Sequence, residues 1–352
     1  MLPRLRCHVT AAMACRRIGS LQAGVPRTRP LYAERQRHRG LVRVEGEEAA
    51  DFLQGLVTND MRHLKGNTSA IYCLLLNRQG RVLYDSIIYH LSHSTFLLEC
   101  DVARVSQLER HLRMHKVRRR LVVEDATGDF SVWCVFDPAP DMTQQTQVDA
   151  ESLYMNPKVQ NEVALHLAGD SKDITAVQDP RVRQLGHRLV VPATTVSLRG
   201  LLPGVEENTG NYMFRSLRYR LGVGEGSEEL PSAKSLPLEA NCDYLHGVSF
   251  HKGCYVGQEL TARTYHTGVI RKRLLPLIFS EDASEVSADA SVVDETGRAV
   301  GKVRACLGCH GLGLLRVEEC LAAERLTVEG HIVQTFRPYW WPLQAPKSKA
   351  SL

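Results

Sequence analysis

The segment from 41 to 117 alternates strand-like and helix-like patterns in an order that a parallel nucleotide-binding sheet does not have. Short β-rich runs alternate with segments whose apolar residues recur at helical spacing. Asn77-Arg-Gln-Gly80 joins two of the β-rich runs and is typical of a hairpin turn. We expect strands over 41–44, 70–76, 81–91 and 94–100, and helices over 49–56 and 102–117. This order predicts an α+β layer.

The second half of the chain predicts another α+β segment and then a small barrel. We expect strands over 130–136, 163–169 and 187–192, a surface loop over 138–151, and a helix over 212–222. After Arg271 the pattern changes to regularly spaced short strands without an amphipathic helix, which is typical of an antiparallel barrel. The predicted domains are a presequence (1–33), a first α+β domain (34–125), a second α+β domain (126–265) and a β-barrel (266–345).

The first 33 residues differ from the rest of the chain in charge. They contain six arginines, no lysine and no carboxylate, and the first acidic residue is Glu34. Such a segment is typical of a mitochondrial transit peptide, and a disordered basic tail is the alternative. The remaining 38 basic residues nearly balance the 39 acidic ones, so we expect no nucleic-acid partner. No run of 18 apolar residues predicts a transmembrane helix.

Ten cysteines are spread along the chain without regular spacing, and one of them stands in an unusual setting. Cys254 lies between Gly253 and Gly257, which permit a tight bend that presents the thiol at the surface. The nearby ammonium of Lys252 and a helix start near Gln258 would favour the thiolate, which attacks electrophiles and ligates soft metals. A buried structural cysteine at a strand-to-helix corner is the alternative.

Two other motifs favour simpler interpretations. Cys306-Leu-Gly-Cys-His310 has the spacing of a c-type haem attachment site, but it lies in a strand-rich segment and no second cysteine pair completes a zinc site. Residues 110–120 hold six lysines and arginines and no acid. That run could bind a polyanion, although a solvated helix end is the favoured interpretation.

Several longer strings point to a known family. Lys252-Gly-Cys-Tyr-Val-Gly-Gln-Glu259, with Leu236-Pro-Leu-Glu239 and Gly247-Val-Ser-Phe250, closely resembles the signature of the YgfZ-type folate-binding proteins, relatives of the glycine-cleavage aminomethyltransferase (T-protein). Supporting matches lie at 52–60, 77–81, 179–181 and 185–188. With the arginine-rich start, the chain is similar over about residues 40 to 340 to the mitochondrial iron–sulfur cluster assembly branch of that family.

The resemblance implies an aminomethyltransferase-like fold. Intertwined α+β domains, including a ferredoxin-like unit, would be followed by a C-terminal antiparallel β-barrel around a central folate-type cavity. It also implies a mitochondrial matrix protein, monomeric when free, that matures [4Fe–4S] proteins with A-type iron–sulfur carriers. The implied cofactors are tetrahydrofolate and a [2Fe–2S] cluster shared with a partner.

The resemblance also assigns roles to individual residues. Cys254 is the implied functional thiol and ligand of the shared cluster, framed by Lys252, Gly253, Tyr255, Gly257, Gln258 and Glu259. Asp60 falls where the aminomethyltransferase carries its catalytic carboxylate, and Asn59 beside it is the other implied folate contact. Cys306 and Cys309 are not part of the family pattern.

Two classes of function follow from these assignments. The favoured one is an assembly factor without turnover of its own; because one cysteine cannot hold an iron–sulfur cluster, a partner must supply the other ligands. The alternative is a tetrahydrofolate-dependent aminomethyl transferase that uses Asp60 as an acid or base.

Overall fold

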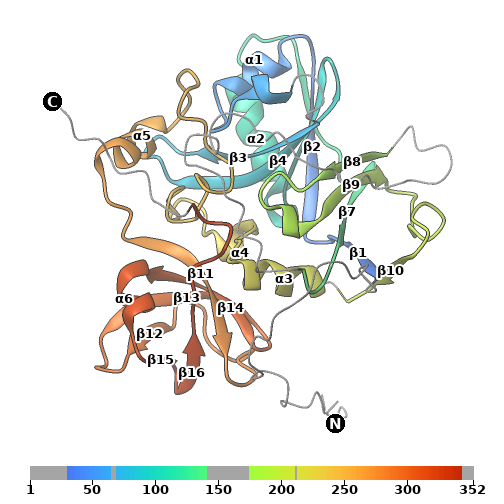
Figure 1. Ribbon diagram of the computed structural model, residues 1–352. Helices are drawn as coiled ribbons and strands as arrows, with labels where there is room; N and C mark the ends of the chain where they lie inside the picture. The colour runs from blue at the N-terminus through green and yellow to red at the C-terminus, as the bar shows by residue number, and fades with distance from the viewer. Residues whose placement is uncertain (1–29, 65–68, 141–173, 211, 343–352) are drawn as a thin grey trace.

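The computed structural model describes residues 30–64, 69–140, 174–210 and 212–342. Two sheets with their helices form one part of the molecule, and the C-terminal barrel lies beside them (Figure 1). The predicted strand over 163–169 and most of the predicted loop over 138–151 lie outside the described residues. No helix in the described ranges is long and apolar enough to cross a membrane.

The first sheet has five antiparallel strands, and the sequence predicted four of them. In spatial order they are β3 (Ala70–Leu76), β4 (Val82–Ser92), β5 (Thr95–Asp101), β2 (Arg39–Glu45) and β6 (Val122–Asp125). The helices α1 (Ala49–Gln54) and α2 (Val105–Lys116) pack on one face, where Leu108 and Leu112 of α2 join Val42 and Leu98 in a common core. The predicted helix over 102–117 is shorter, because residues 102–104 form a 3₁₀ turn capped by Asp101.

The second sheet combines strands from distant parts of the chain. Its order is β10 (Val205–Asn208), β1 (Leu31–Arg35), β7 (Phe130–Phe136), β9 (His187–Pro192) and β8 (Thr175–Gln178). The β1–β10 pair is parallel and the other pairs are antiparallel. β1 therefore begins inside the predicted presequence and lies in the sheet of the second α+β unit.

Three helices connect the sheets to the barrel. They are α3 (Met213–Leu221), α4 (Gly226–Glu229) and α5 (Gln258–Thr267). α3 ends at Gly222, whose left-handed conformation (φ 72°) terminates the helix in the way that a glycine favours.

The barrel is closed and antiparallel. Its order is β11 (Lys272–Phe279), β14 (His310–Arg316), β13 (Ala299–Leu307), β12 (Ser291–Asp294), β15 (Leu326–Val328) and β16 (His331–Gln334). A short helix α6 (Val317–Ala322), which the sequence did not predict, follows β14. Six residues are too few for helical periodicity to show in the sequence.

Buried charges join the two sheets. Arg188 of β9 contacts Glu99 of β5, Glu225 before α4 and Asp179, whose Oδ2 lies 2.9 Å from the arginine Nε. The surrounding ion pairs extend this contact into a larger group that we call the central ion cluster: Arg39, Asp85, Glu99, Asp179, Arg181, Arg188, Arg218, Glu225 and Glu229. Burial opposes ionisation of Glu225, but the arginines around it hold its pKa well below the ordinary value.

Candidate functional site

The loop from 247 to 257 is attached to the segment that follows α1. Ser249 N–H donates to the carbonyl oxygen of Thr58 (3.0 Å), and Val256 N–H donates to that of Gly55 (3.2 Å). The Thr58 hydroxyl in turn donates to the carbonyl oxygen of Gly247. These bonds fix both ends of the loop on the first α+β unit, although its residues lie far along the chain.

Lys252 anchors the middle of the loop. Its Nζ atom donates to the carbonyl oxygens of Gln54, Val57 and Asn59, each at 2.7 Å, which uses all three ammonium protons. The Nζ atom also lies 5.1 Å from the ring centre of the buried Tyr255. Burial lowers the pKa of Lys252 to about 8. The ammonium therefore faces the backbone after α1 and holds the loop there. Its action on the Cys254 thiol stays a prediction.

Gly257 fixes the junction between the loop and α5. It has φ 78°, and a Cβ atom there would lie 2.2 Å from the carbonyl oxygen of Asn77 in the β3–β4 turn. Gly80 in the same turn has φ 77°, and a Cβ atom on it would lie 2.8 Å from Cβ of Leu260. Two glycines are therefore needed for the hairpin turn and the start of α5 to touch.

The thiol of Cys254 is exposed between these two anchors. Of the cysteines in the described ranges, Cys73, Cys100, Cys134, Cys242 and Cys320 are buried, Cys306 is half-buried, and only Cys309 is also exposed. Gly253, next to Cys254, has no atom within 4 Å of the position that a Cβ would take. The structure thus contradicts the alternative of a buried structural cysteine, and it leaves open space beside Gly253.

The other motif residues support the loop in different ways. Tyr255 is buried in the core that the two sheets share. Gln258 and Glu259 form the first turn of α5, with Glu259 exposed. A carboxylate in this turn interacts favourably with the helix dipole. It therefore offsets the positive potential at the N-terminus of α5, which we expected to favour the thiolate of Cys254.

Asp60 and Asn59 make their polar contacts within the protein. Asp60 accepts hydrogen bonds from Gln54 Nε2 and from the backbone and guanidinium of Arg62. Burial alone would raise the pKa of Asp60, but the hydrogen bonds from Arg62 and Gln54 outweigh burial and lower it to about 2. Asn59 donates to the carbonyl oxygens of Tyr72 and His246 and accepts from Asp60 N–H. A carboxyl group with so low a pKa is a poor proton acceptor near neutral pH.

The two motifs that favoured simpler interpretations lie away from this loop. Cys306 lies near the end of β13 and Cys309 in the turn to β14, and burial raises the pKa of Cys306 to about 11. His310 Nδ1 lies 3.3 Å from the Ser216 hydroxyl of α3. The part of the chain that the structure describes contains no group of three metal-ligating side chains. Arg118, Arg119 and Arg120 are exposed just after α2.

Comparison with known proteins places the chain in a family. The family description "GCVT N-terminal domain" matches residues 36–154, and "CAF17, C-terminal beta-barrel domain" matches residues 271–343. The mitochondrial iron-sulfur cluster assembly factor IBA57 of Mus musculus is 39% identical, over 87% of this chain and 84% of its own length. The chain belongs to the mitochondrial iron–sulfur cluster assembly factors. The Homo sapiens member is 37% identical, over 86% and 83%. The predicted mitochondrial localisation is confirmed, and the matrix compartment stays a prediction.

A solved structure supports the fold assignment. The glycine cleavage system aminomethyltransferase T from Bartonella henselae superposes with a TM-score of 0.65 over 88% of this chain and 86% of that one, at 16% identity. At this identity the likeness shows the fold alone. The predicted aminomethyltransferase-like α+β fold with a C-terminal antiparallel barrel is confirmed.

Proposed function

We propose that this protein takes part in mitochondrial iron–sulfur cluster assembly and that Cys254 is the side chain that contacts the cluster. The exposure of this thiol, on a loop whose flanking residues are fixed by internal bonds, carries the proposal. Thiolates are the ligands that iron–sulfur clusters require, and an exposed one is available to a partner. The relatives named as iron-sulfur cluster assembly factors support the same role.

A single thiol at this site calls for a partner. A cluster needs about four ligands, so the remaining ones come from an A-type carrier that docks on the Cys254 loop. The product is a [2Fe–2S] cluster shared between the two proteins, on the way to mitochondrial [4Fe–4S] clients. The open space beside Gly253 lets the carrier backbone approach the thiol closely. In this proposal the protein is a monomer when no carrier is bound.

Reconstitution with an A-type carrier tests this proposal. The matched variants are Cys254→Ser and Cys309→Ser, since both remove an exposed thiol; Cys306→Ser serves as a half-buried control. We expect the visible absorption of the shared cluster to be lost only in Cys254→Ser, because a hydroxyl is a hard, weakly acidic ligand. Equal cluster content in all three variants, together with equal rescue of matrix [4Fe–4S] enzymes in depleted cells, would remove Cys254 from this role.

The transferase alternative has less support. Tetrahydrofolate binding is compatible with the fold, but Asp60 and Asn59 already bond to protein atoms. We expect no aminomethyl transfer to tetrahydrofolate by the purified protein. Transfer that disappears in Asp60→Asn would favour the alternative instead.

A further inference from the structure

A cavity of about 330 Å³ lies where α5, residues 236–239 and the start of the barrel come together. None of Cys254, Lys252, Asp60 or the glycines of the Cys254 loop lines it. Its volume lies in the range of small-molecule sites. The role proposed for the Cys254 loop therefore makes no use of this cavity.

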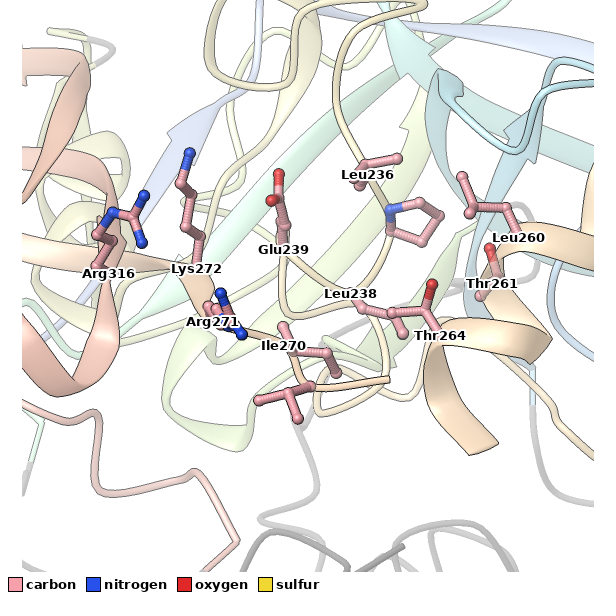
Figure 2. A pocket seen from close by; sticks show the side chains of 12 residues that line it. Leu236, Leu238, Glu239, Leu260, Thr261, Thr264, Ile270, Arg271, Lys272 and Arg316 are labelled. Carbon is pink, nitrogen blue, oxygen red and sulfur yellow. The ribbon is translucent and has the colours of Figure 1, made fainter. Parts of the chain in front are cut away.

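The two ends of the cavity differ in chemistry. Figure 2 shows Lys272 and Arg316 at one end and the apolar side chains of Leu236 and Leu260 at the other, with Glu239 between them. Ile270 and Val269 continue the apolar wall. Val269 is 78% exposed, so apolar surface also reaches the rim.

The charged end has more cations than carboxylates. Lys272 and Arg316 lie directly opposite each other on β11 and β14, an arrangement in which like charges repel. Arg271 lines the same end, and Arg304 and Arg81 also act on Glu239.

Carboxylates compensate only part of this positive charge. Glu319 lies 3.6 Å from Arg316, and Asp289 pairs with Arg304 at 2.5 Å. Among the described residues that line the cavity, Glu239 is the one carboxylate. An anion between Lys272 and Arg316 would relieve their repulsion.

We propose that this cavity binds an amphipathic anion, with its apolar body against Leu236, Leu260 and Ile270 and its carboxylate or phosphate between Lys272 and Arg316. The site is separate from the cluster-binding proposal, since it depends on neither Cys254 nor the carrier. Its ligand is a molecule with one acidic head and an apolar chain or ring of about ten carbon atoms, a size estimated from the range of such sites.

Isothermal titration calorimetry of the full chain tests the proposal with three probes. Decanoate and decyl phosphate carry the two anionic heads, and decylammonium carries the same chain with the opposite charge. We expect both anions to bind at least about ten-fold more tightly than decylammonium, and the tighter anion identifies the head group. Absence of anion binding, or equal binding of decylammonium, overturns the proposal.

Matched variants locate the binding. Lys272→Met removes a cation from the cavity, and Lys302→Met makes the same change at an exposed position of the barrel outside it. We expect about a ten-fold loss of anion affinity in Lys272→Met and less than a two-fold change in Lys302→Met. Thr264→Phe fills the apolar part and should abolish binding. If Lys272→Met and Thr264→Phe leave the affinity for the anions unchanged, the proposed site is wrong. We expect Cys254→Ser to bind decanoate as the wild type does, because the two sites are independent.

Discussion

Gly80 and Gly257 lie back to back: a Cβ atom on Gly257 would stand 3.3 Å from the Cα of Gly80. One glycine belongs to the β3–β4 turn and the other ends the Cys254 loop, so this contact sets where α5 begins. The position of the exposed thiol therefore depends on the first sheet.

Gly257→Ala should destabilise the protein, whereas Gly253→Ala should not. Alanine at Gly257 is strained at φ 78° and meets the Asn77 carbonyl oxygen, at a cost of about 2 kcal/mol or more. Gly253 has open space, so a methyl group there should change stability by less than about 0.5 kcal/mol. Urea unfolding of both variants compares the two positions. If the carrier docks against the open space beside Gly253, Gly253→Ala should weaken carrier binding while the fold stays intact.

Lys252→Met should lower the free energy of unfolding by about 3 kcal/mol, because three backbone carbonyl groups lose their ammonium donor. Denaturant unfolding gives this value. The rate at which Cys254 reacts with a disulfide reagent then distinguishes anchoring of the loop by Lys252 from activation of the thiol by Lys252. Unchanged stability with a slower thiol reaction would return Lys252 to the role of a thiol activator.

Arg188→Met should be among the most damaging single changes. It leaves Glu99, Asp179 and Glu225 buried without their shared cation, and breaking such a network costs about 3–5 kcal/mol. The exposed Arg199 provides the control, since Arg199→Met should leave the melting temperature nearly unchanged. Equal melting temperatures for the two variants would mean that the central ion cluster does not hold the sheets together.

Asp60 should contribute to the loss of stability in acid. Its folded-state pKa of about 2 lies below the ordinary value of 3.8. The stabilisation by ionised Asp60 is thus complete above about pH 4 and disappears as the pH falls toward 2. Asp60→Asn lacks this contribution, so the difference in unfolding free energy between wild type and variant should shrink over that interval. A difference that is constant from pH 5 to pH 2 contradicts the assignment.

Charge reversal of Arg118, Arg119 and Arg120 should affect docking more than folding. All three are exposed, and Arg119 lies 3.8 Å from Glu48 in a surface pair that contributes little. We expect each reversal to change stability by less than about 0.5 kcal/mol. Melting temperature and carrier affinity at low and high salt test this expectation. A large fall in melting temperature would show that the arginines are structural.

The sequence predicted the parts of the fold that depend on neighbouring residues. The β-rich runs and the Asn77–Gly80 turn predicted the β3–β4 hairpin, and apolar residues at helical spacing predicted α2 and α3. It did not predict that β1 pairs with β10 and β7, because nothing in Leu31–Arg35 specifies partners so distant in the chain. The 179–181 and 185–188 strings were recognised only as family matches, since no local pattern indicates that Arg181 and Arg188 are buried among carboxylates.

The candidate site was predictable to a similar extent. Glycines around Cys254 predicted an exposed thiol, and the structure agrees. The role of Lys252 was not predictable, because its three acceptors belong to a segment almost two hundred residues earlier. A contact of that kind requires the tertiary structure.

The parallel pairing of β1 with β10 also constrains the order in which the chain can fold. Because a chain is synthesised from its N-terminus, Leu31–Arg35 is present long before Val205–Asn208. Until β10 arrives, one edge of β1 remains unpaired, and pairings across such long chain separations are slow to form. The second sheet is thus completed only after most of both α+β units is present, and until then the free edge of β1 is open to incorrect pairing with other strands.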